Sequence, residues 1–128
     1  MLVAAVTNTT KFTVKEGEYF YPDVLMTCST PILVDPRPQS LLNPEIIVEV
    51  LSDTTETYDR GAKWLAYRMI PTLTDYVMVA SGRRELEHYQ RAADGSWTLH
   101  TVTGGGVCTL ANGVALELAK LYRLVAID

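Results

Sequence analysis

The sequence predicts an α/β (α+β) fold with a mixed central sheet and few flanking helices, in one domain over residues 1–128. Two apolar runs, residues 44–52 and 75–80, are typical of buried strands. The segment between them is predicted to be a helix. A strand–helix–strand order is typical of two parallel strands joined by a crossover helix. The remaining segments read as an antiparallel meander. Both kinds of pairing therefore belong to one sheet.

The N-terminal part of the chain alternates β-forming residues with turn residues. Thr10–Val14 predicts a strand, and Glu16-Gly17 supplies a turn. Tyr19–Met26 is aromatic and then aliphatic, which predicts a strand bent or interrupted at Pro22. The proline-rich segment from Pro31 to Pro44 predicts a loop.

A helix is expected from about Thr54 to Met69. Asp53 and Glu56 have the spacing of a capping box, and Pro71 ends the helix. The elements expected after it are a strand at Asp75–Ala80, a turn at Ser81-Gly82, a hairpin of Glu85–Gln90 and Trp97–Val102 around Asp94-Gly95, a loop at Gly104–Gly106 and an amphipathic helix at Val114–Tyr122.

The composition is that of a soluble globular protein, with 128 residues, 48% hydrophobic and 20% charged. The apolar N-terminus has no basic region and is too short to span a bilayer. We therefore expect a cytoplasmic protein with no membrane partner. Cys28 and Cys108 are far apart and predict small core residues. The net charge of −4 counts against an extensive nucleic-acid surface, although a local basic patch could offset it.

Glu49 is an acid in the middle of an apolar strand sequence. Burying a carboxylate there costs several kcal/mol unless a cation or hydrogen-bond donors compensate it. A metal ion or a lysine would supply that compensation. We therefore take Glu49 as the first candidate for a functional residue.

Two further residues complete a candidate site. Asp23 stands at the head of an apolar strand, and Lys63 lies in the helix after Glu49, on one face with Asp59 and Tyr67. If that helix packs over the strand, Lys63 can reach toward Glu49. Two carboxylates and a backbone carbonyl suit Mg²⁺, which would stabilise charge on a phosphoryl oxygen.

Each of these residues also has an ordinary structural interpretation. Asp23 after proline could be a turn acid, and Glu49 could be a rim or salt-bridged strand residue. Lys63 could form a solvated pair with Asp59. His88 and His100 have no second ligand at metal spacing and are expected to be surface or hairpin residues. A buried, unpaired Glu49 would also predict that Glu49→Ala leaves stability unchanged or raises it.

Three segments together resemble one family. They are Tyr21-Pro22-Asp23-Val24, Pro44–Ser52, and Tyr58–Arg68 with Ile70-Pro71 and Tyr76–Val79. The family is a large bacterial group of restriction-endonuclease-like proteins in the PD-(D/E)XK superfamily, formerly a domain of unknown function. The resemblance runs from about Thr10 to the C-terminal helix.

The resemblance implies a restriction-endonuclease-like fold and a divalent-metal nuclease site. Asp23 would be the PD acid and Glu49 the second acid, and the catalytic set would be Asp23, Glu49 and Lys63. Asp23, Glu49 and the carbonyl of Val50 would bind Mg²⁺ or Mn²⁺. The motif lysine would fall at Leu51, so Lys63 would supply it from the following helix.

The resemblance also departs from the family in one respect. Family members carry a longer N-terminal part, whereas this chain is expected to start almost at the Asp23 strand. A missing layer would expose apolar sheet surface, which a homo-oligomer could cover. The sequence is compatible with two functions. One is a Mg²⁺-dependent nuclease acting on DNA, and the other is a catalytically inactive fold that serves as a protein-interaction or oligomerisation module.

Overall fold

A computed structural model describes residues 4–7, 11–15, 18–20, 24–27, 33–34, 40–41, 43–52 and 59–122 of the chain. Side chains are described for residues 24–27, 43–52 and 61–122. Asp23, Cys28 and the Asp53–Glu56 segment lie outside the described residues.

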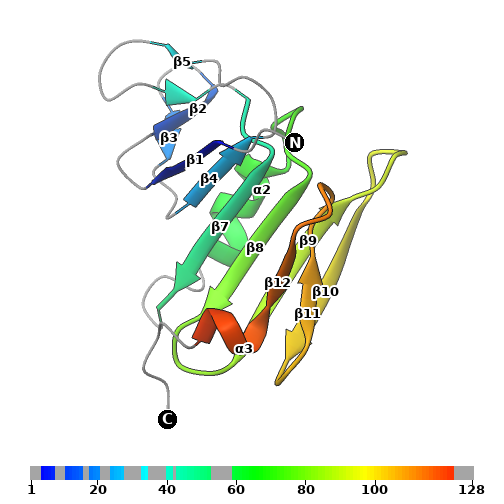
Figure 1. Ribbon diagram of the computed structural model, residues 1–128. Coiled ribbons are helices and arrows are strands. Elements are labelled where there is room, and N and C mark those ends of the chain that lie inside the picture. Colours follow the sequence, from blue (N-terminus) through cyan, green and yellow to red (C-terminus); the bar gives the residue numbers. More distant parts are fainter. Residues whose placement is uncertain are drawn as a thin grey trace.

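A six-stranded mixed sheet forms the centre of the fold, in the order β1-β4-β7-β8-β9-β10 (Figure 1). Only the β7–β8 pair is parallel among these neighbours. The strands are β1 (Ala4–Thr7), β4 (Val24–Thr27), β7 (Ile46–Leu51), β8 (Asp75–Ala80), β9 (Glu85–Arg91) and β10 (Trp97–Thr103). The predicted mixed sheet is thus confirmed.

Two smaller sheets accompany the central one. A four-stranded sheet has the order β3-β2-β6-β5, and a hairpin consists of β11 and β12. Their strands are β2 (Lys11–Lys15), β3 (Glu18–Phe20), β5 (Leu33–Val34), β6 (Ser40–Leu41), β11 (Val107–Thr109) and β12 (Ala115–Glu117).

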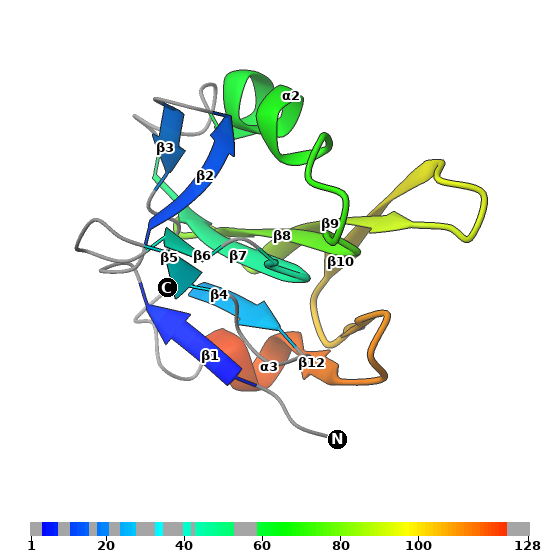
Figure 2. The same ribbon diagram turned by 90° about the horizontal axis from the view of Figure 1, so that it is seen from above.

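Short helices lie on both faces of the central sheet (Figure 2). The π-helix η1 (Asp59–Lys63) continues into α2 (Trp64–Tyr67) and connects the parallel strands β7 and β8 on one face. On the other face lie the β11–β12 hairpin and α3 (Leu118–Leu121). Among the described residues, no helix is long and apolar enough to cross a membrane.

The alternation of β7 and β8 separates two hydrophobic clusters. One cluster lies on the face toward η1 and α2. It contains Ile47, Leu51, Tyr76 and Met78 from the strands and Tyr67 from α2. The other face carries the cluster Ile46, Val77, Val79, Leu86, Cys108, Leu110, Leu118 and Tyr122. Cys108 is buried there, which confirms it as a small core residue. The central sheet is therefore buried on both faces around β7 and β8, as expected for parallel strands.

The strand predicted at Tyr19–Met26 is interrupted as expected, because β3 ends at Phe20 and β4 begins at Val24. The two parts belong to different sheets, β3 to the four-stranded sheet and β4 to the central sheet. The expectation that the chain starts almost at the Asp23 strand is wrong, since β1, β2 and β3 precede β4, and β1 pairs with it. The proline-rich segment contains the two-residue strands β5 and β6.

The predicted helix at Val114–Tyr122 is also wrong over its first half. Gly113 adopts a positive φ of 90°, and Ala115–Glu117 then pairs with β11. The backbone of this segment finds its hydrogen bonds in a hairpin, so only Leu118–Leu121 is helical. The predicted strand at Asp75–Ala80 and the hairpin turn at Asp94-Gly95 are confirmed.

Candidate functional site

Glu49 lies in the middle of β7 and is only 2% exposed. Its neighbours on the same face of the strand, Ile47 and Leu51, belong to the hydrophobic cluster under η1 and α2. The carboxylate is therefore held in apolar surroundings. A charge in such a place requires several compensating donors.

Three side chains supply that compensation. The Nζ of Lys63 lies 3.0 Å from Oε1 of Glu49, and the hydroxyl of Tyr67 donates to the same oxygen at 3.0 Å. The hydroxyl of Tyr76 donates to Oε2 at 2.9 Å. Hydrogen bonds to an ionised group are the stronger kind in proteins. The four residues therefore form a buried charged cluster around one carboxylate, which we call the Glu49 cluster.

The local fold explains how these donors meet. Lys63 ends η1 and Tyr67 ends α2, so the two residues are one helical turn apart on the face toward the sheet. Tyr76 lies on β8, two residues before Met78, the register partner of Glu49. It therefore points to the same face as Glu49. The shared face of Lys63 and Tyr67 was predicted from their helical spacing, whereas the contact of Tyr76 with Glu49 was not predicted.

An aromatic stack extends the Glu49 cluster toward the β9–β10 hairpin. The ring of Trp64 stacks on Tyr89 with centroids 3.9 Å apart, and it lies nearly parallel to Tyr76 at 6.0 Å. Trp97 meets Trp64 edge-on at 4.9 Å. These rings fix α2 against the sheet, and with it the position of Lys63.

The other residues of the predicted site, Asp23, Val50 and Leu51, are not members of the Glu49 cluster as the structure describes it. Asp23 lies outside the described residues, but Val24 after it is the register partner of Val48, the residue before Glu49. The side chain of Val50 is half exposed, on the face away from the Glu49 cluster. Leu51 is buried in the core. Within the described ranges, no three His, Cys, Asp or Glu side chains are grouped as ligands of one metal ion.

A second buried polar cluster lies on the opposite face, around Asp75. Its Oδ2 is 2.6 Å from Nε2 of His88, and it also accepts from Gln90 and from the backbone N–H of Ala111. Thr74 donates to Oδ1 at 2.6 Å. The backbone bond from Ala111 ties the end of the β11 segment to the central sheet.

His88 lies in the β9–β10 hairpin, as one of its two expected placements had it, but it is not a surface residue, because its side chain is only 3% exposed. The signal was present in the sequence: His88 alternates with Leu86 on β9, so it belongs to the buried face. His100 is exposed, as expected.

The charges of this second cluster are set by its surroundings. Burial raises the pKa of the Asp75 carboxyl, but hydrogen bonds from His88, Thr74 and Ala111 outweigh it, so that pKa lies below its ordinary value. Burial, and then the Asp75 charge, raises the pKa of the Cys108 thiol to about 11. Cys108 is therefore a protonated thiol at neutral pH rather than a nucleophile.

Two curated relatives from Synechocystis sp. (strain ATCC 27184 / PCC 6803 / Kazusa) are similar to this chain. "Uncharacterized protein slr1290" is 40% identical over 118 residues, which cover 88% of this chain and 59% of the relative. "Uncharacterized protein sll1609" is 36% identical over 86 residues, which cover 67% of this chain and 49% of the relative. The chain thus spans only about half of the length of these relatives.

Among solved structures, a crystal structure from Anabaena variabilis ATCC 29413 is similar in fold. It is described as a putative nuclease belonging to DUF820, and it superposes with a TM-score of 0.69 at 11% sequence identity. The match covers 94% of this chain and 68% of that one. At this identity the likeness concerns the fold.

The model of the Uma2 family, described as "Putative restriction endonuclease", matches residues 2–122. The match includes both strands that carry the Glu49 cluster and the helical segment between them. This chain belongs to the Uma2 family of restriction-endonuclease-like proteins.

Proposed function

We propose that this protein is a nuclease that uses Mg²⁺ or Mn²⁺ to hydrolyse phosphodiester bonds of DNA. The observation that carries the proposal is the buried carboxylate of Glu49, held by Lys63, Tyr67 and Tyr76. Apolar residues of similar volume often stabilise a core as well as a buried ion pair does. Stability alone therefore does not require this cluster, whereas metal-dependent chemistry needs a fixed carboxylate. Membership of the Uma2 family supports the same activity.

In this proposal Glu49, Asp23 and the main-chain carbonyl of Val50 would hold the ion. The set fits a hard divalent cation because every donor is an oxygen. The antiparallel pairing of Val24 with Val48 supports the assignment of Asp23 and Glu49 to neighbouring strands. A bound ion would supply Lewis-acid stabilisation of charge on the phosphoryl oxygen.

The other residues of the Glu49 cluster would act by position and charge. Lys63 is partly exposed while its Nζ reaches the carboxylate, so its ammonium can face a phosphate as well as Glu49. There it would stabilise the negative charge that develops in the transition state. Tyr67 and Tyr76 would keep the two carboxylate oxygens of Glu49 in a fixed orientation.

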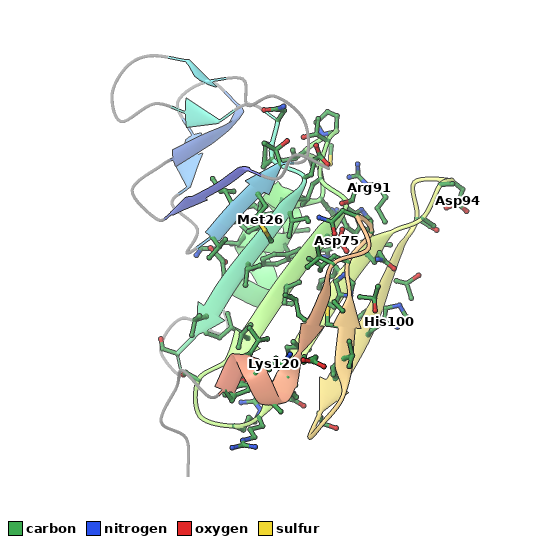
Figure 3. All side chains as sticks on the ribbon, in the orientation of Figure 1. Met26, Asp75, Arg91, Asp94, His100 and Lys120 are labelled. Carbon is green, nitrogen blue, oxygen red and sulfur yellow. The ribbon has the colours of Figure 1, made fainter. Side chains whose placement is uncertain are left out.

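The test is cleavage of plasmid DNA by the purified protein with Mg²⁺ or Mn²⁺. Glu49→Gln should reduce the rate by several orders of magnitude, because no other group would replace a metal-binding carboxylate. Asp94→Asn is the matched control, since Asp94 lies at the exposed tip of the β9–β10 hairpin (Figure 3) and bonds only locally to Ser96. Both variants must be folded at the assay temperature.

A second candidate function is a catalytically inactive fold that self-associates or binds another protein. Leu65 and Met69, one helical turn apart, are 57% and 69% exposed on the outer side of the α2 segment. The net charge of −4 counts against an extensive nucleic-acid surface. Equal background cleavage by the parent protein and Glu49→Gln, with no rise of the melting temperature in Mg²⁺ or Mn²⁺, would favour this candidate. Sedimentation of Leu65→Ser and the parent protein would then test for a homo-oligomer.

A further inference from the structure

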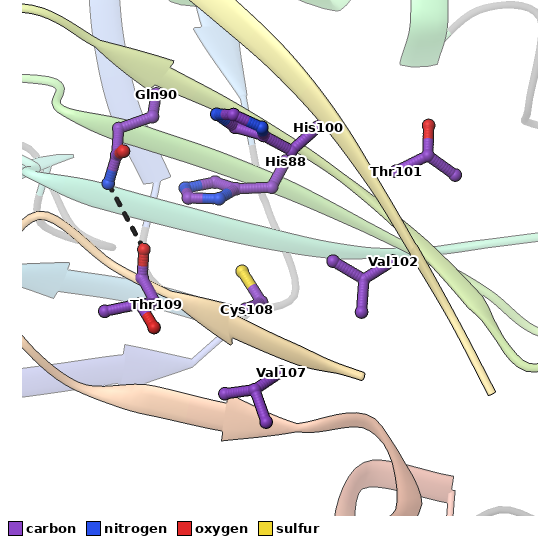
Figure 4. A pocket seen from close by; sticks show the side chains of 8 residues that line it. All are labelled: His88, Gln90, His100, Thr101, Val102, Val107, Cys108 and Thr109. Atoms are coloured by element: carbon purple, nitrogen blue, oxygen red, sulfur yellow. Dashed lines mark hydrogen bonds between the residues drawn. The ribbon is translucent and has the colours of Figure 1, made fainter. Parts of the chain in front are cut away.

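A polar pocket of about 340 Å³ lies on the face of the sheet opposite the Glu49 cluster. Strands β9, β10 and β11 line it, and His88, His100, Gln90 and Cys108 contribute side chains (Figure 4). A hydrogen bond from the Gln90 amide to the carbonyl of Thr109 closes one end. None of these residues takes part in the proposed nuclease site.

The two histidines face each other across the β9–β10 pair. His88 and His100 are direct register partners, so their side chains leave the sheet on the same face. Their ring centroids are 6.1 Å apart with a tilt of 40°. Two imidazoles on one tetrahedral ion, with bonds of about 2.0–2.1 Å, have centroids roughly 5 Å apart. A modest rotation of the exposed His100 ring would close the difference.

Asp75 contacts the side of the His88 ring that carries Nε2. Nε2 of His88 is engaged in a 2.6 Å contact with Oδ2 of Asp75, so Nδ1 is the ring nitrogen that remains to bind an ion. A carboxylate behind a histidine is the usual arrangement around metal-binding imidazoles, where it fixes the tautomer and orients the ring.

We propose that His88 and His100 form a two-imidazole binding site for a divalent transition-metal ion, with Asp75 as the positioning residue behind His88. Imidazole nitrogens suit Zn²⁺, Ni²⁺ and Cu²⁺, whereas Mg²⁺ prefers oxygen. Among the described residues no three His, Cys, Asp or Glu side chains form a ligand group, so this part of the chain would supply two ligands, with solvent at further positions. The site is independent of the proposed nuclease activity.

Calorimetric titration with Zn²⁺ and Ni²⁺ tests the site, using untagged protein that carries Glu49→Gln to disable the opposite face. One ion should bind per chain, and His100→Ala should weaken binding at least about tenfold. His100 is exposed, so this variant should fold normally. Thr98→Ala is the matched control, because Thr98 is exposed on the same face of β10, two residues away, and does not line the pocket.

Imidazole NMR spectra give a second readout, since the chain has only two histidines. Zn²⁺ should shift the ring signals of both His88 and His100 at the same stoichiometry, and Mg²⁺ should shift neither. The proposal is overturned if His100→Ala binds Zn²⁺ as tightly as its parent, if Thr98→Ala weakens binding equally, or if only one ring responds.

Discussion

The hydroxyl of Tyr76 donates a 2.9 Å hydrogen bond to Oε2 of Glu49, between two adjacent parallel strands of the central sheet. Both side chains are buried, and the two partners of Oε1, Lys63 and Tyr67, come from the helical segment that connects the same two strands. The carboxylate is thus held from the sheet on one side and from the helix on the other. Glu49 is therefore a buried carboxylate with hydrogen-bond donors at both oxygens rather than an unpaired one.

Tyr76→Phe should lower the free energy of unfolding by about 1.5–3 kcal/mol, the usual range for a hydrogen bond to a charged group. The ring stays in place, and the hydroxyl that bonds to Glu49 is removed. Tyr89→Phe is the control, because it keeps the ring stacked on Trp64 and lies outside the Glu49 cluster. Urea unfolding of the three proteins measures the difference. Equal losses in both variants would contradict the assigned role of the Tyr76 hydroxyl.

Glu49→Ala should destabilise the protein, contrary to the expectation from sequence alone. That expectation assumed an unpaired carboxylate, whereas removing Glu49 takes the acceptor away from Lys63, Tyr67 and Tyr76. Each hydrogen bond to a charged group contributes roughly 1.5–3 kcal/mol. Thermal unfolding without metal should therefore give a clearly lower melting temperature for Glu49→Ala. An unchanged or higher value would restore the sequence-based expectation.

Lys63→Met should also destabilise the protein, by about 1–3 kcal/mol, because it removes the ammonium that lies 3.0 Å from the buried carboxylate of Glu49. The partial exposure of Lys63 places the loss below that of a fully buried pair. In the double variant with Glu49→Gln the loss should be smaller than the sum of the single losses. The exposed pair of Lys120 and Glu117, at 2.7 Å, is the control cycle and should show a much weaker coupling. Equal coupling in both cycles would contradict the buried ion pair.

The sequence was sufficient to predict the centre of the fold and one half of the candidate site. Apolar runs defined β7 and β8, and helical spacing placed Lys63 on the face toward Glu49. These are short-range patterns, in which a residue's direction follows from its own element. The catalytic roles of Asp23, Glu49 and Lys63 stay predictions.

What the sequence did not reveal depends on pairing between distant segments. Tyr76 reaches Glu49 only because of the β7–β8 register, and His88 meets Asp75 only because β9 lies beside β8. The same holds for Ala115–Glu117, which looked helical by its apolar spacing but pairs with β11. Tertiary pairing overrides a weak local preference in a segment of this length.

Arg91 should be important for anchoring the β9–β10 hairpin to the end of α2. Its guanidinium donates to the carbonyl oxygens of Arg68 and Pro71 at 2.8 and 3.0 Å and lies 4.5 Å from the Trp97 ring. A lysine cannot reproduce this planar, forked geometry. Arg91→Lys should therefore lower the free energy of unfolding by about 1–2 kcal/mol. The exposed Arg84→Lys is the control, and an equal effect of both in urea unfolding would contradict the anchor.

Asp75 should make stability depend on pH in acid. Its pKa in the folded protein lies below the ordinary 3.8, because the hydrogen bonds from His88, Thr74 and Ala111 outweigh the effect of burial. A depressed folded pKa adds stability that is present above the unfolded pKa and disappears as the pH falls through the folded one. Stability should therefore decline below about pH 4.

Asp75→Asn should remove this part of the pH dependence, since an amide does not titrate. Urea unfolding of the parent protein and the variant between pH 2 and pH 7 measures it: the gap between the two curves should be widest near neutral pH and narrow as the pH falls below about 4. Asp94→Asn is the matched control, because the pKa of Asp94 is also lowered, by hydrogen bonds from Ser96, but its carboxylate is fully exposed. A hydrogen bond in solvent is weakly coupled to folding, so this variant should follow the parent curve. If the Asp75→Asn and parent curves stay parallel through acid pH, the bonds from His88, Thr74 and Ala111 do not hold an ionised Asp75.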